Sequence, residues 1–323
     1  MNVDTPNTST GQDYQSTFTL RRKPRRIISR FAPLSLVILA LLLTGCIPEP
    51  AFVDLASCIA LDPSKTCEWL KVVFGVPELE PVDNPGQADM VYEETQVTTA
   101  AGETLRVWYV RSPENRGTIV FSNGGVGEMA CYLLITKTLY DEGWSFVMYD
   151  YQGFGGSTGR PELDSLYGDL DAVLDWTLAN TDAEQVTLMG VSGGSIPSVA
   201  HAAAQPEFVN AVILDGVISL RAEIERFSYL CAGRPERYYT LFDDETRLQV
   251  QIQQVTQPIL AVVYGQDEYA TSAHVPGILA LSPAPATILE FPDLPHARGP
   301  YHEPDRYFEN VKAFLDSIWP TQP

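Results

Sequence analysis

Basic residues are scarce in this chain. Its 323 residues include 21 Lys and Arg against 41 Asp and Glu, so the formal net charge is −20. A surface this acidic excludes binding of nucleic acid or anionic lipid through charge, because those partners attract basic patches. The acidity itself is explained by the solubility that a high net charge provides.

Histidine and cysteine are also few, and they lack the spacing of a metal site. The four histidines are scattered through the chain, and the five cysteines include no C-x-x-C pair. Zinc sites built from these residues typically use closely spaced pairs of ligands. The sequence therefore predicts that the protein binds no metal.

The N-terminal region has an apolar run, but it is too short to span a bilayer comfortably. This run covers residues 34–43, and it follows a basic stretch at 21–26 and precedes Thr44-Gly45-Cys46. A basic start, a short apolar middle and small residues at the end are typical of an export signal. We therefore predict that residues 1–45 are a removable signal peptide.

Cys46 is the predicted site of lipidation. The residues Leu43-Thr44-Gly45-Cys46 resemble a bacterial lipobox, in which the cysteine is lipidated and becomes the first mature residue. This resemblance implies a lipid anchor that holds the protein at the cell envelope, on the extracytoplasmic side of a membrane. The alternatives are an uncleaved membrane anchor and an ordinary signal with an incidental cysteine.

Four cysteines remain after Cys46, and export to an oxidising compartment makes disulfides plausible. Cys58 and Cys67 are close in sequence and form the favoured pair. Cys131 would then pair with Cys231. Four cysteines allow three pairings, and the sequence does not select one of them.

From residue 90 onward, short apolar runs alternate with helical patterns. Segments 91–98 and 104–111 flank a turn that contains glycine, which predicts an antiparallel hairpin. Further strands are predicted at 118–121, 145–149, 185–189, 211–214, 258–264 and 287–291, and helices at 128–142, 161–180, 196–204 and 305–319. This alternation predicts an α/β fold: an eight-stranded, mostly parallel sheet covered by helices on both faces.

Two segments depart from this pattern. Residues 46–89 are rich in proline and acidic residues, so we interpret them as a tether and an N-terminal segment. Residues 90–323 are the predicted α/β domain, which is large enough to bury one core. Within it, residues 218–257 are mainly helical in pattern and lie between two strands, which predicts a small helical lid.

The residues Gly190-Val191-Ser192-Gly193-Gly194 spell the motif G-x-S-x-G. A predicted strand precedes them and a predicted helix follows them, which is the setting of a nucleophile elbow. The glycines allow a tight turn, and the helix N-terminus favours negative charge that develops near the serine. Ser192 is therefore the predicted nucleophile.

The motifs around this serine resemble those of the α/β-hydrolase superfamily, over roughly residues 91–319. The stretch Asp150-Tyr151-Gln152-Gly153-Phe154-Gly155-Gly156-Ser157 is similar to a D-x-x-G-x-G-x-S stretch of that family. In the family a serine, an acid and a histidine follow one another along the chain, each after a strand. The resemblance implies the α/β-hydrolase fold.

The same resemblance implies partners for Ser192. Asp267 follows the strand at 258–264 and is the favoured acid, and His296 follows the last strand and is the favoured base. Asp215, at the end of the preceding strand, is the alternative acid. His302 is the alternative base.

The resemblance also implies two backbone amides that stabilise an oxyanion. One belongs to Gly193, directly after the serine. The other belongs to Gly125, in the loop Asn123-Gly124-Gly125-Val126-Gly127, which is similar to the family's His-Gly-x motif with asparagine in place of histidine. A phosphate-binding loop is excluded because no G-K-[ST] follows.

These residues together predict a serine hydrolase that cleaves a small-molecule carboxylic ester through an acyl-enzyme, with no cofactor. Serine at position 192 excludes the dehalogenases and epoxide hydrolases of this fold, which use aspartate there. The alternatives are a peptidase or a thioesterase of the same fold. A catalytically inactive envelope-binding lipoprotein is a further alternative, of another class.

Overall fold

The computed structural model describes residues 82–125, 127–162, 164–217, 244–267 and 273–319, together with Cys67, Leu70, Lys71 and Gly75. The chain divides into two units, Met1–Gly45 and Cys46–Pro323, and every described residue belongs to the second. The predicted signal peptide, the predicted lipidation site at Cys46 and residues 218–243 of the predicted lid lie outside the described residues. They stay predictions.

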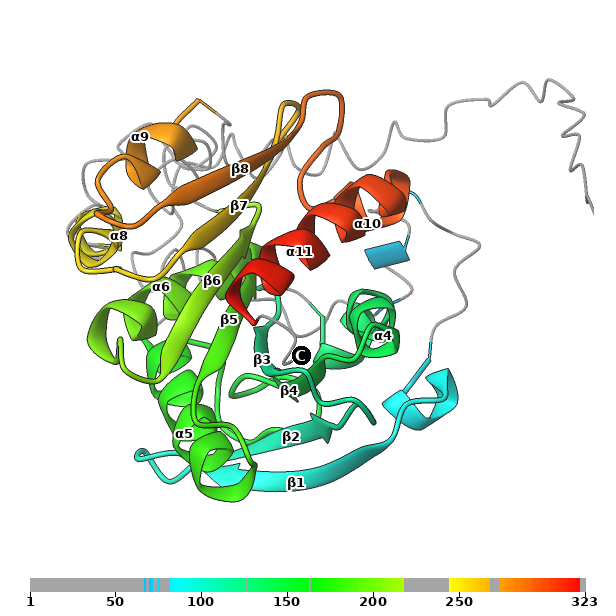
Figure 1. Ribbon diagram of the computed structural model, residues 1–323. Coiled ribbons are helices and arrows are strands. Elements are labelled where there is room, and N and C mark those ends of the chain that lie inside the picture. The colour runs from blue at the N-terminus through cyan, green and yellow to red at the C-terminus, as the bar shows by residue number, and fades with distance from the viewer. Residues whose placement is uncertain are drawn as a thin grey trace, which may run out of the picture. The chain divides into compact units, whose positions relative to one another are not determined.

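Eight strands form a single sheet in the order β1-β2-β4-β3-β5-β6-β7-β8 (Figure 1). Strand β2 runs antiparallel to β1 and to β4, and all other neighbours are parallel. The eight-stranded, mostly parallel sheet is therefore confirmed. The strands are β1 (Tyr92–Thr98), β2 (Thr104–Val110), β3 (Thr118–Ser122), β4 (Ser145–Tyr149), β5 (Val186–Val191), β6 (Val209–Asp215), β7 (Ile259–Tyr264) and β8 (Ala286–Phe291).

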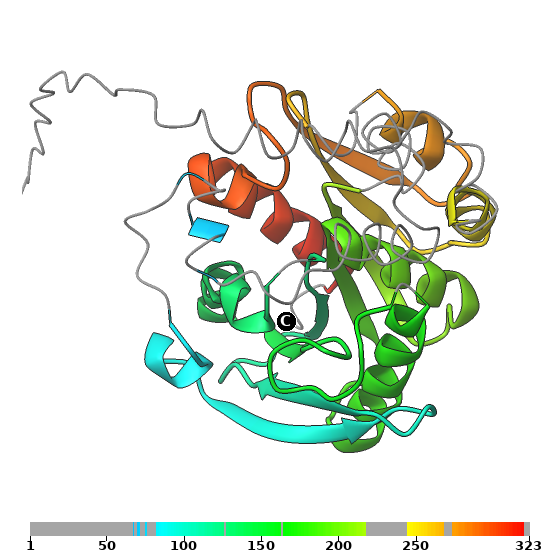
Figure 2. The same cartoon turned by 180° about the vertical axis from the view of Figure 1, so that it is seen from behind.

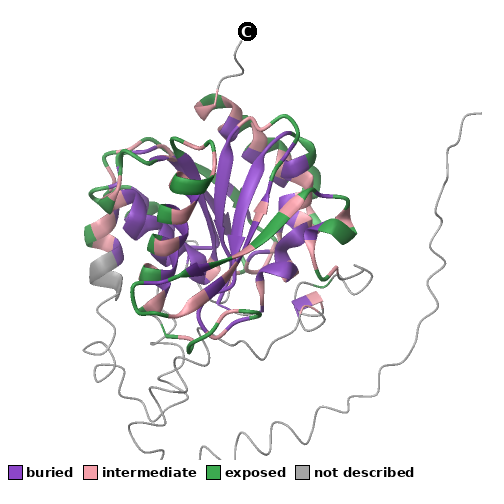
Figure 3. Cartoon of the chain, turned by 90° about the horizontal axis from the view of Figure 1, so that it is seen from below, coloured by how far each residue is buried: buried purple, intermediate pink, exposed green. Residues whose placement is uncertain are grey.

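The central strands are buried along almost their whole length because both of their faces are covered. Side chains alternate between the two faces of a strand. In β3, Ile119 and Phe121 therefore join one apolar core, and Val120 joins the other. Figure 3 shows these strands as buried, with exposed residues gathered on the outer sides of the helices.

Helices form a layer on each face of the sheet (Figures 1 and 2). The core on one face includes residues of α5 (Ser165–Asn180), α6 (Ser195–Ala204), α8 (Asp244–Ile252) and α9 (Val275–Leu279). The core on the other face includes residues of η1 (Pro85–Ala88), η2 (Met129–Tyr132), α4 (Leu133–Asp141), α10 (Gly299–His302) and α11 (Pro304–Ile318). The sheet is thus shielded from water on both sides, as a parallel sheet requires.

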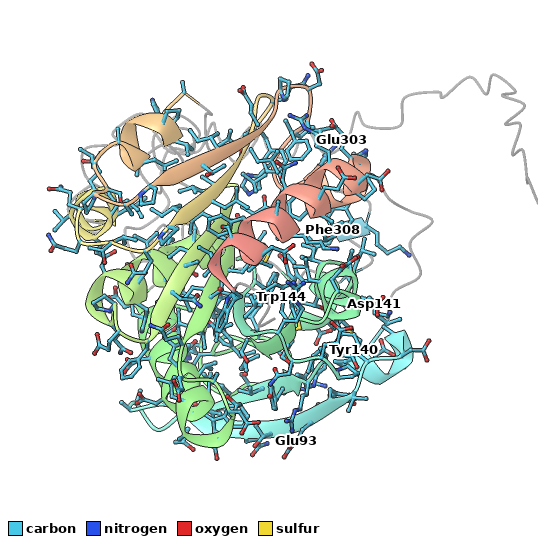
Figure 4. All side chains as sticks on the ribbon, viewed as in Figure 1. Glu93, Tyr140, Asp141, Trp144, Glu303 and Phe308 are labelled. Carbon is cyan, nitrogen blue, oxygen red and sulfur yellow. A yellow bond between two sulfur atoms is a disulfide. The ribbon has the colours of Figure 1, made fainter. Side chains whose placement is uncertain are left out.

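Aromatic contacts fix the end of α11 on its face of the sheet. Trp144, labelled in Figure 4, follows α4 and is fully buried. Its ring lies edge-on to that of Trp319, with 6.5 Å between the ring centroids. The guanidinium of Arg116 lies 4.7 Å from the centre of the Trp144 ring, which adds a cation–π contact. These contacts hold the helix that carries Tyr307, a residue of the network described below.

A disulfide joins Cys67 to Cys131 across 64 positions of sequence. The predicted Cys58–Cys67 pair is therefore wrong, and so is the pairing of Cys131 with Cys231. Closeness in sequence favoured Cys58, but the entropy of loop closure rises only slowly with length. The fold decides the pairing, because it places the Cα atoms of Cys67 and Cys131 within bridging distance, at 4.9 Å.

No helix within the described ranges combines the length and the apolar character needed to cross a bilayer. Helix α5, for comparison, has 16 residues, and charged side chains are spread along it.

Candidate active site

Ser192 occupies a sharp turn between β5 and α6. Its φ angle is +51°, in the left-handed region, and a short 3-10 turn, η3 (Ser192–Gly194), leads into the helix. The flanking glycines permit this bend. A Cβ on Gly194 would lie 2.0 Å from the Ser122 carbonyl oxygen, and one on Gly190 would lie 2.4 Å from the Gly194 carbonyl oxygen. The serine side chain is only partly buried, so it is presented at the surface of the turn.

His296 lies between Ser192 and Asp267. Its Nε2 atom is 2.8 Å from the serine Oγ, and its Nδ1 atom is 2.7 Å from Oδ2 of Asp267. The serine follows β5, the aspartate follows β7 and the histidine follows β8, so all three lie at the carboxyl edge of the parallel sheet. The structure thus brings together the three residues that the sequence singles out.

The site is shielded from water on the acid side. The Asp267 side chain is 2 % exposed and that of His296 is 11 % exposed. Because the carboxylate faces Nδ1, it favours the tautomer with a proton there, which leaves the Nε2 lone pair directed at the serine hydroxyl. This arrangement can remove a proton from the hydroxyl and return it later.

The two alternative residues do not contact the serine hydroxyl. The carboxylate of Asp215 accepts hydrogen bonds from the hydroxyls of Tyr264 and Tyr307, each at 2.7 Å. The ring of His302 lies beside Gly75 of the N-terminal segment. Among the described residues, the histidine next to Ser192 is therefore His296.

Burial changes the acidity of Asp215. Its side chain is inaccessible to water, and this desolvation raises the pKa of the carboxyl to about 6, although the two tyrosine hydroxyls oppose the shift. The positive charge that His296 can carry also lowers the pKa of Asp215, while the charge of Asp267 raises it. Asp215 is therefore coupled electrostatically to the candidate site, although it does not contact the serine.

The two predicted oxyanion glycines lie side by side. A Cβ on Gly193 would be 3.1 Å from the backbone nitrogen of Gly125. Asn123, which stands where the family has histidine, is fully buried, and its Nδ2 donates to the carbonyl oxygens of Gly124 and Gly127. The backbone carbonyl oxygen of Asn123 accepts a hydrogen bond from the Tyr151 hydroxyl at 2.8 Å. The asparagine thus braces the glycine loop from within.

A second brace of this loop was not predicted from the sequence. The buried carboxylate of Asp150 accepts from the backbone N–H of Met129 at 2.8 Å and from that of Gly156 at 3.2 Å. It therefore joins the D-x-x-G-x-G-x-S stretch to the segment that follows the glycine loop. Burial raises the pKa of this carboxyl, and the two N–H groups oppose the shift. The sequence shows the stretch but not the distant amide that it holds.

Within the described ranges, no group of three or more His, Cys, Asp or Glu side chains is placed to hold a metal ion. The chemistry that these residues can support by themselves is proton transfer and nucleophilic attack.

Comparisons with known proteins agree with this architecture. The family model described as "Serine aminopeptidase, S33" matches residues 113–232. The chain is 23 % identical over 269 residues to the alpha/beta hydrolase domain-containing protein WAV2 of Arabidopsis thaliana, covering 78 % of this chain and 87 % of that protein. It is 28 % identical over 184 residues to alpha/beta hydrolase domain-containing protein 17B of Xenopus tropicalis, covering 54 % and 59 %.

Solved structures show the same fold. The esterase Pf2001 of Pyrococcus furiosus superposes with a TM-score of 0.63 at 18 % identity, covering 75 % of this chain and 96 % of that one. Est1E of Butyrivibrio proteoclasticus, solved with ferulic acid, superposes with a TM-score of 0.60 at 19 % identity, covering 69 % and 99 %. The chain has the α/β-hydrolase fold, and the family match and the relatives support its placement in the α/β-hydrolase superfamily.

Proposed function

We propose that this protein is a serine hydrolase that cleaves small carboxylic esters through an acyl-enzyme. The observation that carries the proposal is the continuous chain of contacts from the Ser192 hydroxyl through the His296 imidazole to the Asp267 carboxylate. This chain of contacts combines a nucleophile, a base and an acid at the carboxyl edge of the sheet.

The proposed reaction has two halves. Ser192 Oγ attacks the ester carbonyl carbon while His296 Nε2 takes its proton, and the C–O bond to the alcohol breaks as the imidazolium protonates the leaving oxygen. Water then attacks the acyl-enzyme, with the same imidazole as base, and the acid leaves as the serine regains its proton. Asp267 holds the ring and stabilises the imidazolium in both halves.

The backbone N–H groups of Gly193 and Gly125 are the proposed donors to the oxyanion. Attack moves negative charge onto the carbonyl oxygen, and fixed donors placed there lower the barrier. Support comes from the close approach of the two glycines and from the braces that hold the glycine loop. Removing one such donor in other hydrolases typically slows the reaction by about a hundredfold or more.

The proposed nucleophile and base can be tested together. A fluorophosphonate probe should label the wild type and not Ser192→Ala, since the probe needs an activated serine. His296→Ala should lower the turnover of p-nitrophenyl acetate by at least about a thousandfold. His302→Ala is the matched control and should keep most of the activity. Folded wild type that neither labels nor turns over ester would contradict the proposal and favour an inactive binding protein.

A peptidase is the second candidate, because the matching family model is described as a serine aminopeptidase. Ester cleavage is favoured here by the two structural neighbours described as esterase or solved with a ferulic acid ligand. The p-nitroanilide of an amino acid tests for a peptidase, because its cleavage requires breaking an amide bond. Turnover of the anilide by the wild type that is lost in Ser192→Ala would overturn the ester assignment.

We further propose that the protein acts at the cell envelope, anchored by lipid at Cys46. The support is the lipobox-like sequence that ends the apolar run at 34–43. A palmitate analogue fed to an expressing bacterium should label the wild type and not Cys46→Ala. Equal labelling of both would exclude this cysteine as the anchor.

A further inference from the structure

A buried polar cluster lies beside the histidine of the candidate site. It consists of Asp215 at the end of β6, Tyr264 at the end of β7 and Tyr307 in α11, and all three side chains are inaccessible to water or nearly so. Each oxygen of the carboxylate accepts one tyrosine hydroxyl at 2.7 Å. We call these three residues the Asp–Tyr–Tyr cluster.

The cluster is joined to the loop that carries His296. The backbone N–H of Gly299, three residues after the histidine, donates to the Tyr264 hydroxyl at 3.3 Å. A Cβ on Gly299 would lie 2.9 Å from a ring carbon of Tyr307 and 3.0 Å from the Tyr264 hydroxyl. The end of the histidine loop is therefore seated directly on the two tyrosines.

The backbone next to Asp215 also contacts the imidazole. Gly216 has a φ angle of +63°, and a Cβ there would lie 2.8 Å from Cε1 and 3.1 Å from Nδ1 of His296. Strand β6 thus supports one side of the ring, while the cluster holds the loop beyond it. A displacement of Asp215 would reach the imidazole by both routes.

Within the part of the chain that the structure describes, groups from several elements act on this carboxylate. Tyr264 and Tyr307 contact it, and the charges of His296 and Asp267 act on it. In turn, Asp215 acts electrostatically on Tyr132 of η2 and on Tyr301 of α10. No lysine or arginine is among these groups, so the cation that Asp215 can stabilise from this set is the imidazolium.

We propose that Asp215 is a positioning residue for the reaction: through the Asp–Tyr–Tyr cluster it fixes the His296 loop, and its negative charge stabilises the imidazolium that forms as Ser192 loses its proton. This proposal rests on the hydrolase function proposed above. Asp267 stays the acid that contacts the ring, and Asp215 acts on the ring through the loop and through its charge. The site thus uses two carboxylates with separate tasks.

The test is the pH profile of kcat/KM for p-nitrophenyl acetate in Asp215→Asn. The amide has the same shape, and it can still accept from Tyr264 and donate to the Tyr307 oxygen, so the loop keeps most of its support. Without the charge, the imidazolium is less stable, and the acidic midpoint of the profile should fall by about half a pH unit or more. We expect kcat to fall by about tenfold with KM little changed.

Asp169→Asn is the matched control. Asp169 is also fully buried, accepts two hydrogen bonds from Gln152, and has its pKa raised by burial to about 6, but its charge acts on Tyr149 and Tyr151. Its variant should keep the wild-type midpoint and kcat. A folded Asp215→Asn variant with an unchanged midpoint and unchanged kcat would overturn the proposal.

Two further measurements cover the cases in which Asp215→Asn does not fold or the wild type hydrolyses no ester. If Asp215→Asn does not fold, Tyr307→Phe removes only one hydroxyl, and it should lower kcat several-fold; unaltered kinetics would overturn the proposal. If the wild type hydrolyses no ester, NMR titration of the His296 ring still applies. A midpoint that is equal in wild type and Asp215→Asn would overturn the proposal independently of the function.

Discussion

Single glycines set the geometry of the turn at Ser192. The position of a Cβ on Gly194 falls inside the contact distance of three backbone atoms, with the Ser122 oxygen 2.0 Å away. Backbone atoms of a central strand cannot move aside as a flexible side chain can. Gly168, in contrast, lies in α5, and a Cβ added there would have no neighbouring atom within 4 Å. Replacing glycine by alanine should therefore have opposite effects on the stability of the protein at these two positions.

We predict that Gly194→Ala destabilises the protein by more than about 3 kcal/mol and abolishes fluorophosphonate labelling, because β3 and the turn must separate. Gly168→Ala should instead stabilise it by about 0.5–1 kcal/mol, since alanine loses less backbone entropy in a helix. Urea unfolding followed by circular dichroism measures both values. Equal stabilities for the two variants would contradict the close approach at Gly194.

Sequence motifs single out Ser192, Asp267 and His296, because each follows a strand with a recognisable apolar pattern, and the structure places their side chains in contact. They left Asp215 as an alternative acid. Its actual partners are two tyrosines from elements 49 and 92 residues away along the chain, and no local pattern encodes such a contact. Contacts between residues this far apart in the sequence could not be predicted from local motifs.

At the scale of elements, the disulfide joins two segments that lie far apart in the sequence. It ties the N-terminal segment to η2, and the backbone of Gly127 in the glycine loop touches it: a Cβ there would lie 3.1 Å from the Cys131 sulfur and 2.7 Å from Leu70. The bridge therefore lies next to the loop that carries Gly125. Its loss should affect both stability and the loop.

Replacing Cys67 and Cys131 together by serine should lower the free energy of unfolding by about 4 kcal/mol. This is the free energy that corresponds to the loss of unfolded-chain entropy when a loop of this length is closed. Turnover should also fall, because the glycine loop loses a neighbour. Unfolding in urea with and without dithiothreitol gives the same comparison on the wild type. If dithiothreitol destabilises the double variant as much as it does the wild type, its effect does not come from this bridge.

The strands and the long helices could be predicted from the sequence, and the short helices could not. All eight strands lie where their apolar runs predict them, within two residues at each end. Helices α9 and α10, with five and four residues, have no helical period to detect, and the predicted helix 128–142 begins as the 3-10 turn η2. Disulfide pairing failed for a related reason, since it depends on packing between distant elements.

For the molecule as a whole, buried carboxyls make stability depend on pH. Burial raises the pKa of both Asp215 and Asp169 to about 6, against about 4 in an unfolded chain. Between these values the folded state binds more protons than the unfolded state. Stability contributed by each group is therefore present at low pH and is lost as the pH rises from about 4 through about 6.

Asp215→Asn should remove the part of the pH-dependent loss of stability that is due to the Asp215 carboxyl. Relative to wild type, the variant should gain stability progressively between about pH 4 and pH 6, by at most about 3 kcal/mol, and the difference should be constant above that range. Asp169→Asn should behave in the same way. Urea midpoints measured at half-unit steps give the curve, and a difference that is flat from pH 4 to pH 8 would show that the carboxyls titrate normally in the folded protein.

The distances along the chain between the reacting residues have a practical consequence. Ser192 and His296 are 104 residues apart, and β6, β7 and β8 must all be paired before their side chains can meet. On the proposed function, a fragment that ends before β8 should hydrolyse no substrate, and neither should a partly folded chain with a detached C-terminal edge. Turnover thus reports the population of fully assembled molecules, and recovery of activity during refolding should lag behind the recovery of helical circular dichroism.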